Sequence, residues 1–556
     1  MRIRFERDFR VFWYKTANCI FVVAVLAGAD FIFFRLQFAN HWTMLFGDRT
    51  DGAIEVAILE HWYNVFLGNS LWHTTNYFYP YSGSLGYNDG YFLYGVIYSA
   101  IRQFGVDPFL SSEMVNVIVK SIGFLGLYWA IRSIFLIPTW LCLLGATVFT
   151  VSNNSFMEAI HAQLFTVGFA PVMAAFLFHA HRACRAGMTR SGVLWCALSA
   201  FWYSAWVLTA FYTAWFFAFF CGLASLLYCV ADPAALRRIW FDRTRFAVPV
   251  VVGAAILVAG LLPFVMVYLP KARETGMHPF AEALTFSPSI FDTFNVGPNN
   301  WLFGKANVWI NARLRPDMPL EGPRASGLPP VLIALFVGAT SWLWCTQAGR
   351  KQVLARSVAA AAAISWLLSL HFGPFTPWQW IHAYIPGAAA IRVIARYQMF
   401  LVGPVVAVVM VWLNARFTGR GRLLLPFLAI LLVAEEINLG FPIGLVPATE
   451  MARLQGVPPF PKGCIVFAVT NVRPGPLAAA PEVDAVYSHN VDAMLIAEYI
   501  GHPTINGMAS FVPPEWKFSA PANGDYAERV QAYVATHRIQ GLCTLDLQTL
   551  SWSGPG

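Results

Sequence analysis

Residues 47–62 read GDRTDGAIEVAILEHW and closely follow an apolar run at 17–38. That run is long enough to cross a bilayer, whose hydrocarbon core requires about 20 residues of helix. The carboxylates Asp48 and Asp51 therefore come just behind a first membrane span, where the chain enters a loop. An acidic pair in this position is the feature around which the rest of the chain is interpreted.

The composition is that of a polytopic membrane protein. Of 556 residues, 58% are apolar and only 12% are charged, and the mean hydropathy is +0.56. Soluble domains carry about 25% charged residues. These values exclude disordered, collagen-like and small disulfide-stapled chains. A net charge of +8, placed mostly in short loops beside apolar runs, argues against a nucleic-acid partner.

Further apolar stretches of similar length follow the first one. The eleven predicted spans are 17–38, 111–134, 136–152, 164–181, 191–209, 211–230, 246–269, 329–346, 353–371, 397–414 and 423–441. Residues 91–104 are apolar but short, and counting them as a span would invert every later loop. We interpret them as an interfacial or re-entrant helix in the first outer loop.

Basic residues set the orientation of these spans. They occur in the N-terminal segment and in every second loop, at Arg2, Arg4, Arg7, Arg10, Lys15, Arg132, Arg182, Arg185, Arg190, Arg237, Arg238, Arg243, Arg245, Arg350, Lys351, Arg356, Arg416, Arg420 and Arg422. The positive-inside rule makes that side cytoplasmic. We therefore predict a multi-pass protein of the bacterial inner membrane, with a cytoplasmic N-terminus and a periplasmic C-terminal tail.

Two domains are predicted from this pattern. Residues 1–441 form an all-α transmembrane domain, in which 39–110 is the first extracytoplasmic loop, and residues 442–556 form a small α/β domain. In the tail, strands are expected at 463–470 and 539–547, and amphipathic helices at 492–500 and 526–537. Cys464 and Cys543 lie in this tail, and an extracytoplasmic location would allow them to pair. The sequence leaves pairing and free thiols both open.

Carboxylates at a membrane boundary, surrounded by aromatic groups, suit the handling of a polar lipid headgroup. Asp89 lies among aromatic residues and glycines in NYFYPYSGSLGYNDGYFLYG, close to Tyr87. A structural alternative for Asp48 and Asp51 is that they cap a helix that starts near Gly52. Trp62, Tyr77, Tyr79, Tyr81 and Tyr87 are either stacking partners for sugars or part of an interfacial aromatic belt.

Three other outer segments carry candidate binding residues. The second turn offers Glu158, His161 and Gln163, although a single boundary histidine is more often structural. The third loop offers Lys271 and Arg273, which also suit the lipid interface. In the fourth, Arg392 and Arg396 are spaced i, i+4, which predicts one helical face at the outer end of a span. Two guanidinium groups there can bind a phosphate; the alternative is snorkelling to headgroups.

Five segments in this order resemble the GT-C superfamily of polytopic glycosyltransferases, and specifically a bacterial branch related to YfhO-like membrane proteins. They are GDRTD…EHW, YFYPYSGSLGYND, EAIHAQLFTVGFAP, IPGAAAIRVIARY and TINGMASFVPPEW. The branch leads us to expect a GD-x-x-D start, a GH-x-x-L-like turn, an LPG…R…R segment and an NG-containing tail. Here Ile385 replaces the leucine, Ile160 the glycine, and Met508-Ala509 follows Asn506-Gly507. No WWDYG-like signature is present, so protein N-glycosylation is not expected.

The resemblance implies an inverting transfer of a sugar from a polyprenyl-phosphate donor to a glycan, lipid or protein acceptor of the cell envelope. Asp51 or Asp48 would be the catalytic base, with Asp51 preferred because it begins the helical run. Arg392 and Arg396, with Lys271 and Arg273, would bind the donor phosphate. Asp89, Glu158, His161, Gln163 and Tyr87 are the expected substrate-binding residues. Mg²⁺ or Mn²⁺ on the acidic pair is an option that two carboxylates do not make specific.

Two other functions compete with this interpretation. A lipid-linked sugar transporter or flippase would need polar groups along a path through the membrane, often in paired repeats. Lys120 is one such group, but no counterpart occurs in the second half of the chain. A non-catalytic scaffold of the same fold is the other alternative, and it would tolerate Asp51→Asn.

Overall fold

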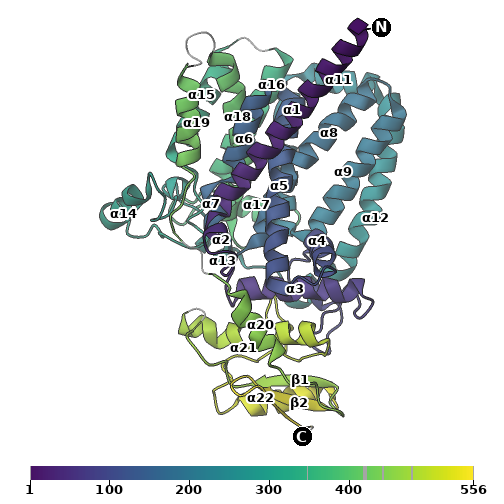
Figure 1. The fold of residues 1–556 in the computed structure, drawn as a ribbon, viewed down its shortest axis with the longest axis vertical. Helices are drawn as coiled ribbons and strands as arrows, with labels where there is room; N and C mark the ends of the chain where they lie inside the picture. Colours follow the sequence, from purple (N-terminus) through teal and green to yellow (C-terminus); the bar gives the residue numbers. More distant parts are fainter. Residues whose placement is uncertain (1, 347–348, 418–422, 441–443, 478–479, 555–556) are drawn as a thin grey trace.

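The chain folds into a helical bundle with a small α/β part at one end. The computed structural model describes residues 2–346, 349–417, 423–440, 444–477 and 480–554. Figure 1 shows the N-terminus and the short helix α11 (Pro233–Phe241) at one end of the bundle, and the C-terminus at the far side of the α/β part. The fold class expected from the sequence is therefore confirmed.

Seven helical segments of the described residues are long and apolar enough to cross a membrane. They are Pro108–Phe135 (α5), Ala162–Arg185 (η2 and α8), Thr189–Thr209 (α9), Phe211–Ala231 (α10), Arg243–Thr275 (α12), Gln352–Ser369 (in α16) and Ile394–Arg416 (η5 and α18). Each coincides with a predicted span. The other four predicted spans correspond to α1 (Arg2–Phe33), α6 (Thr139–Thr150), α15 (Pro330–Cys345) and α19 (Leu425–Ala434), which are not among these seven. With 12 and 10 residues, α6 and α19 are shorter than the spans that the sequence predicted.

Small residues let the bundle helices approach closely. A Cβ atom on Gly123 of α5 would lie 3.0 Å from the Cα atom of Gly168, and one on Gly126 would lie 2.6 Å from the Val172 side chain. Close backbone contact of this kind is a main source of helix association in membranes, where no hydrophobic effect acts between helices. The contact of α5 with η2 and α8 holds the outer turn that α7 (Asn153–Met157) and η2 form between α6 and α8.

Two helices of the first outer loop lie at the lower end of the bundle in Figure 1. They are α3 (Asp51–Phe66) and α4 (Phe92–Arg102). The Trp62 indole packs on Gly95 and its Nε1 donates a hydrogen bond of 2.6 Å to the Gly90 carbonyl. The predicted short helix at 91–104 is confirmed, and its eleven residues are too few to span a bilayer.

The C-terminal part contains a three-stranded sheet covered by helices. It comprises α20 (Pro447–Gln455), β1 (Val466–Thr470), α21 (Pro481–Ile500), α22 (Tyr526–His537), β2 (Leu542–Asp546) and β3 (Ser551–Ser553). Strand β1 pairs in parallel with β2, with Val466 opposite Leu542, and β2 pairs antiparallel with β3. Cys464 and Cys543 form a disulfide, which answers the question that the sequence left open. The predicted domain boundary at 441/442 falls outside the described residues.

A hydrogen-bonded seam joins the C-terminal part to the first outer loop. The Phe78 N–H donates to the Asn506 carbonyl (3.0 Å), and the Tyr79 N–H donates to the Thr504 carbonyl (2.9 Å). The fully buried Glu498 carboxylate accepts hydrogen bonds from the Asn76 backbone (2.7 Å) and side chain (3.0 Å). In this structure the NG pair of the tail therefore forms part of the seam.

Gly507→Ala is expected to destabilise this seam. A Cβ atom at position 507 would lie 2.6 Å from the Phe78 ring, a distance that forces the ring or the backbone to move. Overpacking of this kind costs roughly 1–3 kcal/mol of unfolding free energy. Limited proteolysis of the C-terminal part across a urea series measures the effect. Gly524→Ala is the matched control because nothing lies within 4 Å of its Cβ position, and an equal urea midpoint for both variants contradicts the prediction.

Candidate functional site

The Asp48 carboxylate accepts hydrogen bonds at the start of helix α3. Its Oδ1 accepts hydrogen bonds from the backbone N–H groups of Thr50 (2.9 Å) and Gly52 (3.1 Å), and its Oδ2 accepts one from the Thr50 hydroxyl (2.6 Å). A buried carboxylate with both oxygens used in this way satisfies N–H groups that the helix itself leaves free. The structural alternative thus holds for Asp48.

Asp51, the first residue of α3, has a different environment. Its side chain keeps 40% of its solvent exposure, and its Oδ2 lies 3.7 Å from Nδ1 of His161. Loss of hydration and the Asp48 charge raise the pKa of Asp51 to about 6, although the Arg396 and Arg392 cations oppose the rise. Burial and the same two cations lower the pKa of His161 well below its usual value, so the imidazole is neutral at pH 7.

Arg396 lies at the centre of the acidic residues. Its Nε is 3.3 Å from Oε2 of Glu158, and both side chains are buried. Burial raises the pKa of Glu158, and the charge of Arg396 counteracts this. The same cation also acts on Asp51 and Asp89. Residues from three outer segments that are distant in the sequence thus interact electrostatically with one another.

Arg392 is the more accessible cation of the pair. Its guanidinium is 40% exposed and lies 3.8 Å from Oε1 of Glu282, a loose ion pair. The expectation of a shared helical face is wrong, because residues 391–393 are non-helical and α18 begins only at Tyr397. The cause is the turn at Gly387, which has φ +82° and packs against the rings of Phe211 and Trp215.

Asp89 is held at the same end of the bundle. Its Oδ1 accepts a hydrogen bond of 3.0 Å from the backbone N–H of Phe211, the first residue of α10. Burial raises the pKa of Asp89 to about 6. The next residue, Tyr212, accepts a hydrogen bond of 2.6 Å from the Arg392 backbone through its hydroxyl. The start of α10 therefore ties Asp89 and Arg392 to one element.

The other predicted residues lie apart from this group. Lys271 donates to Glu274 Oε2 (2.8 Å) and to the buried Tyr87 hydroxyl (2.9 Å), and Tyr87 donates to Glu274 Oε1 (2.8 Å). Among the described residues, no hydrogen bond or ion pair links this cluster to Arg392 or Arg396. Arg273 is exposed in the last turn of α12. Gln163 is half-buried in η2, two residues after His161, and its side chain has no hydrogen bond to the group among the described residues.

The sequence analysis missed one residue of the group, Tyr487 of helix α21. The charge of Asp51 contributes to raising the pKa of Tyr487, after burial, and Arg392 and Asp48 also act on it. We predicted a helix only over 492–500, whereas α21 begins at Pro481. Proline at the first helical position followed by Glu482 and Asp484 is a helix-start signal that would have brought Tyr487 onto the same helix.

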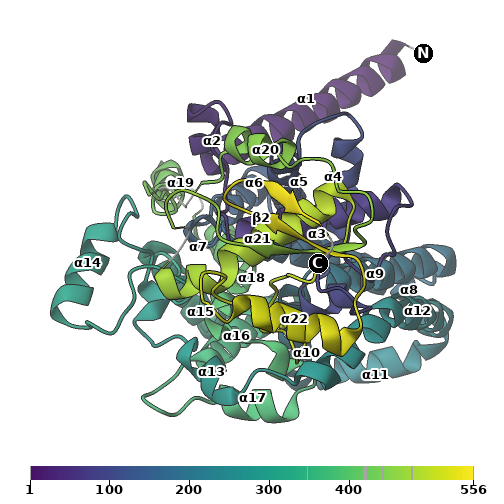
Figure 2. The ribbon, with the colours of Figure 1, turned by 90° about the horizontal axis from the view of Figure 1, so that it is seen from below.

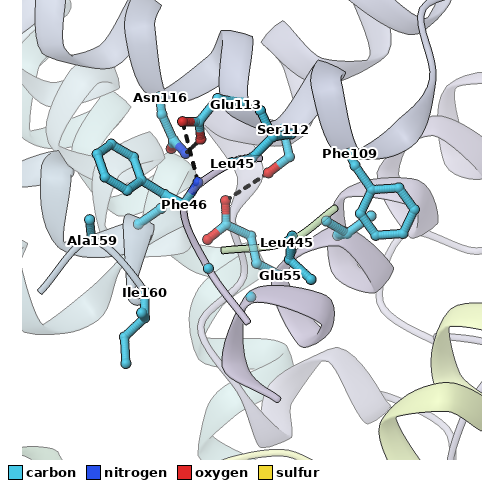
Figure 3. A pocket seen from close by; sticks show the side chains of 14 residues that line it. Leu45, Phe46, Glu55, Phe109, Ser112, Glu113, Asn116, Ala159, Ile160 and Leu445 are labelled. Carbon is cyan, nitrogen blue, oxygen red and sulfur yellow. Dashed lines mark hydrogen bonds between the residues drawn. The ribbon is translucent and has the colours of Figure 1, made fainter. Parts of the chain in front are cut away.

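A small cavity lies behind the start of α3 and is shown in Figure 3. Its volume of about 10 Å³ has room for roughly one water molecule. The Glu55 carboxylate accepts from the Ser112 hydroxyl (3.1 Å), and Glu113 accepts from Asn116 (3.0 Å). Burial raises the pKa of Glu55 to about 8. This cavity is too small for a sugar, and Asp51 does not line it.

Comparison with solved structures identifies the fold. The oligosaccharyltransferase of Archaeoglobus fulgidus in its apo form matches with a TM-score of 0.51 and 11% identity, over 94% of this chain and 69% of that one. Its complex with Zn and sulfate gives 0.50 and 12%, over 94% and 67%. Arabinofuranosyltransferase AftD from Mycobacteria gives 0.49 and 14%, over 89% and 32%. No sequence-family profile and no curated protein sequence matches the chain.

Proposed function

We propose that this chain, which has the fold of the GT-C superfamily, is a glycosyltransferase that moves a sugar from a polyprenyl-phosphate donor to an envelope glycan, lipid or protein acceptor. The observation that carries the proposal is the group formed by Asp51, His161, Glu158, Asp89, Arg392 and Arg396. It combines one accessible carboxylate with two cations at the end of the helical bundle that faces the C-terminal part (Figure 1). The site thus offers candidate residues for binding the donor phosphate, for orienting the acceptor and for accepting the acceptor's proton.

Asp51 is the proposed general base. The acceptor hydroxyl oxygen attacks the anomeric carbon of the sugar, the bond to the polyprenyl phosphate breaks, and inversion results. The hydroxyl proton passes to the Asp51 carboxylate, and the bonding electron pair leaves with the phosphate. A base with a pKa near the working pH is well matched to this task. Asp48 is the weaker candidate because its oxygens already accept three hydrogen bonds.

Arg392 and Arg396 are the proposed phosphate-binding residues, and each has a different role. Arg392 has an exposed guanidinium and only a loose ion pair, so it is free to bind a phosphate through paired N–H groups. Buried Arg396 supplies a fixed positive charge next to the reacting centre, where it stabilises the charge that develops on the leaving phosphate. Tyr487 lies on the C-terminal side of the group and is a candidate to orient the acceptor.

A divalent cation fits this site in part. Asp51 Oδ2 and neutral His161 Nδ1 are 3.7 Å apart, a separation that two ligands of one ion can have. No group of three His, Cys, Asp or Glu side chains suited to a metal occurs among the described residues. Asp51 and His161 would therefore be the protein ligands, with water and donor phosphate completing the shell, as Mg²⁺ sites commonly do. Bound there, the ion would add positive charge beside the phosphate.

The proposed location of the site is the periplasmic face of the bacterial inner membrane. The α8–α9 loop, flanked by Arg185 and Arg190, and helix α11, which carries Arg237, lie at the end of the bundle opposite the acidic group in Figure 1. The positive-inside rule then makes the acidic end extracytoplasmic. The Cys464–Cys543 disulfide supports this orientation, because such bonds persist in oxidising compartments.

The proposal is tested in proteoliposomes that contain the purified chain. Synthetic polyprenyl-phosphate sugars are supplied as donors, and a bacterial envelope extract is supplied as acceptor. Transfer of labelled sugar that requires Asp51 supports the proposal. If no donor of the series transfers its sugar or binds, glycosyl transfer from this donor class is contradicted, and the transporter and scaffold functions become the leading ones.

The pH dependence of the transfer rate follows from the Asp51 environment. With no divalent cation bound, the carboxylate acts as a base only when deprotonated, so the rate measured in a chelating buffer should rise through pH 6 and then level off, and fall below pH 6 as Asp51 becomes protonated. Asp48→Asn keeps an oxygen that can accept the N–H groups of Thr50 and Gly52 but removes a like charge, so it should move the rise to lower pH. An unchanged midpoint in this variant would show that Asp51 is not the titrating base.

A further inference from the structure

Helix α14 (Gly304–Arg313) carries exposed apolar side chains although its backbone is firmly fixed. Trp309 is 56% exposed and Trp301, just before the helix, is 57% exposed. On the opposite side Asn307 is buried and donates hydrogen bonds to the Phe294 carbonyl (3.3 Å) and to Asn295 Oδ1 (3.1 Å). The indoles are therefore held out from the protein by a well-anchored helix.

The exposed face of α14 alternates cations with an indole. Lys305, Trp309 and Arg313 follow one another at intervals of four residues, so they form one stripe along the helix. All three are exposed, and neither cation has a hydrogen bond or ion pair with a described residue. Tryptophan flanked by lysine and arginine on one face is typical of helices that lie in the interface of a membrane.

The position of α14 agrees with this composition. The segment before it is bound just past the end of the apolar helix α19: the Asn300 side chain donates to the Glu435 carbonyl (2.7 Å), and the Trp301 N–H donates to the Ile437 carbonyl (2.8 Å). Figure 1 shows α14 projecting sideways below the lower ends of α15 and α19 and above the C-terminal part, and Figure 2 shows it outside the outline of the bundle.

We infer that α14 lies on the outer-leaflet surface of the membrane as a lateral anchor. Its occupant is an anionic phospholipid surface: Trp309 lies among the headgroups, and Lys305 and Arg313 bind lipid phosphates. The inference takes the outer leaflet from the proposed orientation, but it is independent of the proposed sugar transfer because it uses no residue of the acidic group. It fixes the depth of the outer loop, and with it the height of the site above the bilayer.

The test measures the surroundings of position 309 directly. Trp309→Cys is made in a background with Cys19→Ala and Cys345→Ala, which removes the two exposed thiols. The new thiol is labelled with an environment-sensitive fluorophore, and the whole chain is placed in nanodiscs of phosphatidylcholine and phosphatidylglycerol. Quenching by a headgroup-nitroxide lipid is compared with quenching by aqueous iodide. Glu528→Cys, on the exposed side of α22 far from the bundle, is the matched control.

Lipid quenching at position 309 should exceed that at position 528 at least threefold, with the opposite order for iodide. Iodide quenching at 309 equal to that at 528 overturns the inference, and so does protection from both quenchers, which would mean that protein covers the helix. Lys305→Glu with Arg313→Glu should lower the lipid quenching at least twofold, whereas Lys462→Glu with Lys517→Glu should not. If the first pair has no effect, the assignment of its cations to lipid phosphates is overturned.

Discussion

Asp51→Asn is expected to lower the turnover number of sugar transfer by a factor of about 10²–10⁴, the usual contribution of a positioned general base. The asparagine keeps the size of the side chain and its place at the start of α3, but it cannot accept the acceptor proton. Donor binding should change little, because the arginines remain. Initial rates at saturating donor, together with the dissociation constant of the donor, separate these two effects.

Asp48→Asn is the matched control for this experiment. It lies three residues away and also replaces a carboxylate by an amide, but the amide oxygen can still accept the N–H groups of Thr50 and Gly52. We therefore expect its turnover at pH 8 to stay within a few fold of the wild type. Retention of more than a tenth of wild-type turnover by Asp51→Asn, or an equal loss in both variants, would remove Asp51 from its proposed role.

Arg392→Ala is expected to weaken donor binding by a factor of about 10–100. Hydrogen bonds to charged groups contribute roughly 1.5–3 kcal/mol, and 1.4 kcal/mol corresponds to a tenfold change in affinity. Since Arg392 is exposed and only loosely paired with Glu282, its removal leaves no buried charge behind. Equilibrium binding of a polyprenyl-phosphate sugar, with the sugar-free polyprenyl phosphate as competitor, measures the loss.

Two comparisons sharpen the arginine experiment. Lys462→Ala removes an exposed cation of the C-terminal part and should leave the affinity unchanged. Arg396→Ala should lose stability as well as function, because it leaves Glu158 buried without its partner, a change that costs about 3–5 kcal/mol. Wild-type affinity in Arg392→Ala would contradict the proposed phosphate site without any uncertainty from misfolding.

The spans and the acidic end of the bundle could be predicted because they depend on local patterns. Apolar length predicts membrane helices, and the alternation of basic loops brings the motifs around Asp51, Glu158 and Arg396 to one end. The different roles of Asp48 and Asp51 could not be predicted, because they depend on which backbone N–H groups the folded loop places next to each carboxylate. Lys271 shows the same limit: its commitment to Glu274 and Tyr87 arises from tertiary packing.

Long-range contacts explain the remaining differences. The helical spacing of Arg392 and Arg396 suggested one face, but Gly387 turns the chain where its missing side chain accommodates the rings of Phe211 and Trp215. Tyr487 came into the group only because α21 packs against α3, a contact between segments over 400 residues apart that no sequence period reveals. A second contact between the same two helices is equally non-local: Asn64 Nδ2 donates a hydrogen bond of 2.8 Å to the Glu498 carbonyl.

Helix α3 connects the acidic group to the seam with the C-terminal part. Its 16 residues carry Asp51 at the first position and Asn64, which holds Glu498, near the last. At 1.5 Å per residue the rod is about 24 Å long, so a rotation of roughly 5° about its Asn64 end would displace the carboxylate by about 2 Å. Misplacement of reacting groups by 1 Å can already cost a factor of about 100 in rate. The seam at Glu498 therefore determines how precisely the Asp51 carboxylate is positioned, although the seam contacts the opposite end of α3.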